Sequence, residues 1–223
     1  MSLYESGDST GDVSIEEMFS GNVNCKYIRK VELDELAKLI IRGGWPENID
    51  KEGDDIEVIP RSYIESVITR DINERKDKKR DSNKMRMLIR SLSRNETTIA
   101  GNDTIVKDIE EFENTDDLIA SRLTVADYVS VLDDLYLTAN QEAFSINYRS
   151  SKRIGKSPKR HLVDPSLACA SLDLTVVKLL NDHETFGLLF EALVERDLRI
   201  YMDYLDGHLY HFRDNVSGDE VDS

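Results

Sequence analysis

The stretch that decides the fold runs from residue 124 to residue 148 and reads TVADYVSVLDDLYLTANQEAFSINY. Its first half repeats apolar residues at the spacing of one helix face, which predicts a helix from Thr124 to Leu135. From Tyr136 the helical period is lost and β-branched and aromatic residues dominate, so the second half, to Tyr148, predicts a hairpin. The inward-facing residues of the helix are Val125, Tyr128, Val129, Leu132 and Leu135.

Two more helices are expected before this stretch. Apolar residues recur at helical spacing from Asn83 to Arg94, and a second helix is expected from Thr104 to Asn114. Three helices followed by a hairpin make a winged helix-turn-helix. We place this unit at residues 76–150.

The residues before this unit, 1–75, predict a small helical segment. One helix runs from Val31 to Ile41 and ends at Gly43-Gly44, and another runs from Pro60 to Asn73 with its proline in the first turn. Residues 5–24 are rich in Gly, Ser, Asp and Asn and predict a loop followed by a short docking segment.

The residues after the unit, 151–223, combine helices with a strand. The pattern predicts helices from Ser166 to Leu180 and from Glu184 to Tyr204, followed by a strand from His208 to Arg213. The expected fold class is therefore α+β and mainly α.

Composition restricts the function. The 29 Lys and Arg residues against 44 Asp and Glu residues give a net charge of −15, which argues against uniform attraction to nucleic acid or to an anionic membrane. Two cysteines, Cys25 and Cys169, provide no disulfide framework. No uncharged run approaches the roughly 20 residues of a spanning helix. We expect a cytoplasmic protein with no membrane partner.

Positive charge is concentrated in two segments. Residues 72–94 hold nine basic and three acidic residues, and residues 144–163 hold six basic residues and no acidic one. Such segments are candidates for phosphate contact, although a solvated helix face and hairpin are the commoner explanation. The six basic residues of the second segment are our candidates for nucleic-acid binding: Arg149, Lys152, Arg153, Lys156, Lys159 and Arg160.

Three motifs look catalytic without the context that their chemistry needs. Residues 7–11, GDSTG, match the nucleophile-elbow pattern, but no buried strand precedes them. Residues 155–157, GKS, match the end of a Walker A loop, but Ser150 stands where that loop needs a glycine. His208 and His211 are three apart in an expected strand, so they would lie on opposite faces. We expect no catalytic residue and no metal site.

Several segments, in this order, cover nearly the whole chain: Met1–Gly7, Arg42–Pro46, Tyr63–Asp71, Thr124–Tyr128, Lys156–Lys159, Val163-Asp164, Gly187–Glu191 and Phe212–Asp222. Together they resemble a large family of predicted prokaryotic AAA-type ATPases. The resemblance implies a nucleotide-binding core with Walker A and Walker B, then a helical lid, a winged helix and a nuclease-like region of unknown function. This chain resembles the part after the core, so ATP and Mg²⁺ belong only to a full-length parent and we expect no cofactor here.

The same resemblance implies roles for four residues. Gly44 and Pro46 look like the Gly-x-Pro element with which a lid approaches bound nucleotide, although they also suit a helix end followed by a stiff turn. Glu191 and Asp222 match the first two acidic positions of a restriction-endonuclease-like fold, whose Glu-x-Lys strand is missing. We therefore treat Glu191 and Asp222 as remnant nuclease-like positions, in an incomplete α/β segment.

Three functions remain open at this point. The leading one is a non-catalytic C-terminal part of an AAA-type ATPase that binds DNA through a basic wing or binds a partner. Its presumed recognition helix carries Asp127, Asp133 and Asp134, which would repel a DNA backbone. The first alternative is a module that binds only protein, either the ATPase core or another partner. The second is a degenerate Mg²⁺-dependent nuclease.

Overall fold

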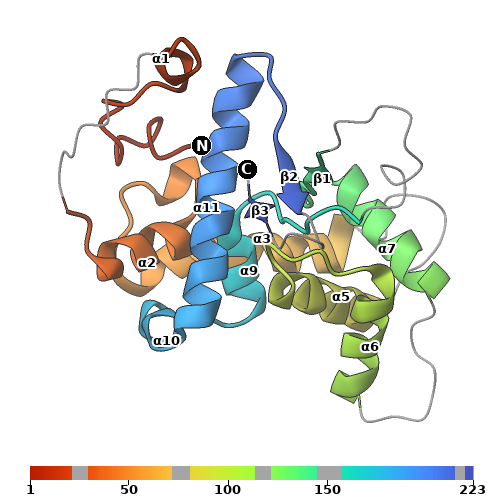
Figure 1. Cartoon of the computed structure of the whole chain (residues 1–223). Helices are drawn as coiled ribbons and strands as arrows, with labels where there is room; N and C mark the ends of the chain where they lie inside the picture. Colours follow the sequence, from red (N-terminus) through yellow and green to blue (C-terminus); the bar gives the residue numbers. More distant parts are fainter. Residues whose placement is uncertain (22–29, 72–80, 114–121, 145–156, 214–218, 223) are drawn as a thin grey trace.

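The computed structural model describes residues 1–21, 30–71, 81–113, 122–144, 157–213 and 219–222 (Figure 1). These residues are mainly helical and carry a small sheet, so the expected class, α+β and mainly α, is confirmed. The helices are α1 (Ile15–Phe19), α2 (Leu33–Arg42), α3 (Val58–Ser66), α5 (Ser82–Arg94), α6 (Asn102–Glu113), α7 (Arg122–Asp134), α9 (Pro165–Ser171), α10 (Val176–Asn181) and α11 (His183–Tyr204). The strands are β1 (Glu142–Ala143), β2 (Tyr210–Arg213) and β3 (Glu220–Val221).

Local sequence explains where the helices begin and end. The Asp81 side chain accepts hydrogen bonds from the first turn of α5, as a good N-cap residue does. Helix α2 buries its apolar face and stops at Gly43, whose φ of +67° favours glycine. Helix α3 passes into a π turn at Val67–Asp71, so the helix expected from Pro60 begins two residues earlier and changes its winding, while the end expected at Asn73 lies outside the described residues.

Helix α9 lies at the centre of the helical part. It packs against α2, α3, α5 and α11, which come from distant parts of the sequence (Figure 1). Its Ser166, Ala168 and Cys169 are buried, and such small side chains let several helices approach one axis closely. The apolar core is one cluster that runs from Ala37 to Leu193, through all three of the expected segments.

Three short segments lie side by side: the turn residues 96–98, in which Thr97 has a φ of +60°, and the extended segments 137–141 and 159–163. The backbone N–H of Ala139 donates to His161 (2.8 Å), and that of Arg160 donates to Thr98 (2.7 Å). The segment 159–163 therefore runs between the other two, antiparallel to 137–141. The sequence predicted a hairpin within 136–148, and the second strand of that hairpin is wrong. Residues 137–141 pair instead with residues 159–163, about twenty positions later.

A second correction concerns the helix expected from Ser166 to Leu180. It is two helices, α9 and α10, separated by a turn in which Asp173 has a φ of +53°. That left-handed conformation cannot continue an α-helix, and the Thr175 side chain then caps the next one.

The sheet joins strand β1 to strands β2 and β3, which lie near the C-terminal end of the described residues. Strand β2 pairs in parallel with β1 and antiparallel with β3. The strand expected from His208 to Arg213 begins two residues later, so His208 precedes β2 and is exposed while His211 on the strand is buried.

Candidate functional site

The structure brings Glu191 and Asp222 together around a lysine. Lys159, on the extended segment 159–163, places its Nζ between the two carboxylates, with 2.6 Å to Oδ1 of Asp222 and an ion pair to Oε1 of Glu191. Glu191 lies on α11 and Asp222 directly follows β3. One ammonium group therefore connects three segments that are far apart in the sequence.

Lys159 keeps its charge although it is only 4% exposed. Burial alone would lower the pKa of the ammonium, but the hydrogen bonds that it donates to Asp222 and Glu191 outweigh burial and leave the pKa raised. The ammonium occupies the space between the two carboxylates where a divalent ion would have to bind. This cluster, Lys159 with Glu191 and Asp222, is called the lysine cluster below.

A second polar cluster lies on the same extended segment. The buried ring of His161 has Nδ1 3.4 Å from a carboxylate oxygen of Glu96 and 3.7 Å from one of Glu195, and neither ring nitrogen makes a hydrogen bond. Glu195 is also paired with Arg199, one turn later on α11. The cluster of His161, Glu96, Glu195 and Arg199 is called the histidine cluster below.

Burial controls the protonation of this cluster. It lowers the pKa of His161 to about 4, although the carboxylate of Glu195 acts in the opposite direction. Burial also raises the pKa of Glu96 well above its ordinary value, opposed in part by the backbone N–H of Leu162, which donates to both carboxylate oxygens at 3.1 Å. The sequence did not point to Glu96, because a single acidic residue in a polar turn carries no pattern.

A third buried network holds the N-terminal helices to α11. Asp164 caps α9 and accepts from the backbone N–H of Gly44 (2.9 Å) and from Nη1 of Arg196 (3.0 Å). Arg196 also donates to its neighbour Asp197 (2.7 Å). Burial would lower the pKa of Arg196, but the two aspartates leave it raised. The Asp-Pro-Ser sequence at 164–166 is an ordinary helix start, and this signal could have located the cap.

The expected lid residues lie next to this network. The Gly44 N–H is used by Asp164, and its carbonyl oxygen accepts from the amino group of Met1 (3.0 Å). Pro46 begins a short 3-10 turn, Pro46–Asn48, and is exposed. Within the described residues, the glycine is thus occupied by internal contacts and the proline ring is accessible.

The basic candidates fall into two groups. Arg149, Lys152, Arg153 and Lys156 lie outside the described residues. Lys159 belongs to the lysine cluster, and Arg160 is 9% exposed and donates to the Ala100 carbonyl (2.9 Å) and the Asn102 side chain (2.8 Å). Burial lowers the pKa of Arg160. These two cations therefore have partners inside the protein and are not displayed to a phosphate.

The outer face of α7 is acidic and partly apolar. Asp133 and Asp134 are exposed and Asp127 is half-buried, while Leu123 is 83% exposed. Arg122, at the start of the helix, forms an ion pair with Asp103 at 3.2 Å.

The described part of the chain lacks two other kinds of site. No group of three or more His, Cys, Asp or Glu side chains there is placed to hold a metal ion. None of the described helices combines the length and the apolar character that crossing a membrane requires. Cys169 is buried on α9, and Cys25 lies outside the described residues.

Comparison with known proteins gives one match. A domain of unknown function (DUF8612) matches residues 33–178, which span α2 to the start of α10 and include Glu96, Lys159 and His161. No curated protein and no solved structure shows significant similarity to the chain. Because the match covers more than half of the 223 residues, the chain belongs to the DUF8612 family, a domain of unknown function.

Proposed function

We propose that this chain is a non-catalytic winged-helix module that acts by binding a partner protein. The observation that carries the proposal is the order of the hydrogen-bonded segments around α7. Helix α5 is followed by the turn 96–98, helices α6 and α7, and then the antiparallel segments 137–141 and 159–163. Three helices followed by two antiparallel segments, with the turn 96–98 hydrogen-bonded alongside, support the proposal of a winged helix-turn-helix.

The charge of α7 favours a protein partner over DNA. In a winged helix that reads DNA, the corresponding helix enters the major groove between two rows of phosphates. Here that helix presents Asp133 and Asp134, and its Arg122 is paired with Asp103. Such a surface repels phosphates and complements a basic protein surface, while the exposed Leu123 adds an apolar contact.

The lysine cluster supports the non-catalytic part of the proposal. A nuclease of the kind that Glu191 and Asp222 resemble needs its carboxylates to hold Mg²⁺ beside a phosphate. In this chain the ammonium of Lys159 lies between them and is paired with both. A metal ion would have to displace a buried cation that makes two ion pairs.

The resemblance to AAA-type ATPases supplies the class of partner. We propose that the module docks on an ATPase core, with the α7 face as one contact and the exposed Pro46 as a second. The ring of a proline is a rigid apolar surface, and Pro46 stands on a turn whose neighbouring backbone at Gly44 is fixed by Asp164.

Binding to a purified ATPase core of the resembled family, measured by isothermal titration calorimetry, tests this proposal. Asp133→Lys with Asp134→Lys should weaken binding by at least about tenfold, because two attractions become repulsions. The matched control is Asp54→Lys with Asp55→Lys, an exposed pair on the short turn Gly53–Glu57, which should leave binding unchanged. Equal affinity of the α7 variant and the wild type would overturn the proposal.

DNA binding is the second candidate function, supported by the four other basic residues of the segment 144–163: Arg149, Lys152, Arg153 and Lys156. A labelled duplex of random sequence at low salt is the probe. Salt-dependent binding that is lost on Lys152→Glu with Lys156→Glu would establish this function instead, through phosphate contacts. Cleavage of the duplex with added Mg²⁺, abolished by Glu191→Ala, would overturn the non-catalytic assignment.

A further inference from the structure

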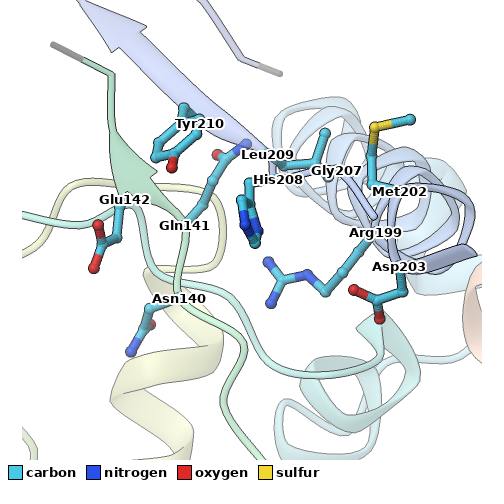
Figure 2. Close-up of a pocket in the computed structure, with 10 residues that line it drawn as sticks. All are labelled: Asn140, Gln141, Glu142, Arg199, Met202, Asp203, Gly207, His208, Leu209 and Tyr210. Carbon is cyan, nitrogen blue, oxygen red and sulfur yellow. The ribbon is translucent and has the colours of Figure 1, made fainter. Parts of the chain in front are cut away.

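A cavity opens beside the C-terminal end of α11. It has a volume of about 330 Å³ and is lined by three segments: residues 140–142, the last turns of α11 from Arg199, and residues 207–210 (Figure 2). This size lies at the lower end of the range of small-molecule sites.

Arg199 is the group in this cavity that is best prepared to bind a ligand. Its side chain is 31% exposed, and its Nη2 is paired with Glu195, a buried carboxylate one turn earlier on the same helix. Among the hydrogen bonds of the described residues, Arg199 uses Nη2 alone. Figure 2 shows the rest of the guanidinium directed into the cavity. The pairing with Glu195 therefore fixes the orientation of the guanidinium, whose other N–H groups remain available to a ligand.

His208 lies opposite Arg199. It stands on the turn before β2, and its ring faces the guanidinium across the cavity (Figure 2). The lining also contains two carboxylates, but the side chain of Glu142 points away from these two groups, and both Glu142 and Asp203 are exposed to solvent, which screens them. The centre of the cavity consequently presents N–H donors of Arg199 and His208 to hydrogen-bond acceptors.

We propose that this cavity binds a small molecule through an oxyanion group, a phosphate or a carboxylate, held by Arg199 and His208. A guanidinium with two parallel N–H groups matches both oxyanions in a bidentate manner, and the imidazole N–H supplies a third donor from another element. Glu195 is a positioning residue for this site, because it orients Arg199 without facing the ligand.

Isothermal titration calorimetry with inorganic phosphate and, separately, with acetate tests the proposal, with sodium chloride at equal ionic strength as the reference. The wild type should bind at least one of the two anions saturably. Binding of phosphate alone, of acetate alone or of both identifies the oxyanion class. No saturable binding of either anion at millimolar concentration overturns the proposal.

Two variants locate the anion. Arg199→Lys keeps the charge and loses the fork, and His208→Asn removes the exposed ring, so each should weaken binding by about tenfold. Arg61→Lys is the matched control, because Arg61 also forms an i,i+4 ion pair, with Glu57, but on α3. Affinity that is unchanged in His208→Asn and in Arg199→Lys would place the anion elsewhere. If Arg199→Lys fails to fold, which circular dichroism would show, His208→Asn decides the result alone.

Discussion

The lysine cluster and the histidine cluster begin two residues apart on one extended segment, and they solve the burial of a titratable group in opposite ways. Lys159 is buried as a cation between two carboxylates that are themselves in contact with solvent. His161 is buried more deeply, also between two carboxylates, but neither of its nitrogens makes a hydrogen bond. The difference shows that a nearby carboxylate stabilises a buried cation only when direct hydrogen bonds offset the loss of hydration.

The protonation states follow from this difference. Lys159 remains charged because its two ion pairs outweigh burial. His161 gives up its proton because burial outweighs the carboxylate of Glu195, and burial raises the pKa of Glu96 in the same cluster. Four experiments test this difference between the two clusters, and they follow in descending order of expected effect.

Removal of the Glu96 side chain should have the largest effect. Glu96→Ala leaves the buried Leu162 N–H without an acceptor and opens a cavity, which should lower the free energy of unfolding by about 3 kcal/mol. Glu96→Gln should cost less than about 1 kcal/mol, because a protonated carboxyl and a carboxamide are both neutral acceptors. Urea unfolding near pH 7 measures both variants. Equal losses in the two would mean that Glu96 is ionised in the folded protein.

Acid should weaken the histidine cluster. The folded pKa of His161, about 4, lies below the unfolded value of 6.5, so its contribution to stability is present above pH 6.5 and is lost as the pH falls toward 4. Between pH 7 and pH 4 the loss should reach about 3 kcal/mol. His161→Gln cannot take up this proton, so its free energy of unfolding should fall less over the same range. Parallel pH profiles for the two proteins would contradict the buried neutral histidine.

Removal of the cation from the lysine cluster should have a smaller effect. Lys159→Met leaves Glu191 and Asp222 facing each other, and we expect a loss of about 2 kcal/mol, below the usual cost of a fully buried broken pair because both carboxylates contact solvent. Lys178→Met, at an exposed lysine on α10, is the control and should change stability by less than about 0.5 kcal/mol. A loss no larger than that of the control would show that Lys159 does not hold the cluster together.

The smallest effect is expected at the outer edge of the lysine cluster. The Asp222 side chain is 53% exposed, so Asp222→Asn should cost about 0.5 kcal/mol, and the difference from the wild type should shrink at high salt. Glu191→Gln, at a less exposed carboxylate, should cost more and respond less to salt. The reverse order would place the main counter-charge of Lys159 on the C-terminal segment.

Periodicity predicted α2, α5, α6 and α7 to within about two residues at each end, because each helix buries a continuous apolar face. It missed the division between α9 and α10, since an aspartate with positive φ has no mark in the apolar pattern. The partner of 137–141 was also missed, because strand pairing across an intervening segment is a tertiary property.

Single residues of the candidate site were predicted, but the contacts among them were not. Glu191 and Asp222 were singled out through a resemblance, and the structure places them together, but nothing in the spacing showed that Lys159 would join them. The histidine cluster combines residues 96, 161, 195 and 199, whose separation in the sequence hides their contact. Long-range polar contacts of this kind depend on the packing of α11 against the extended segments.

The central place of α9 has a consequence for synthesis on the ribosome. Helices α2, α3 and α5 are complete within the first hundred residues, yet the helix that they share as a packing partner begins only at Pro165. Translation adds about 5–20 residues per second, so the nascent chain spends several seconds with these apolar faces made but uncovered. Packing of helix α9 is therefore a late step of co-translational folding. Before it, exposed apolar faces make the nascent chain a substrate for chaperones.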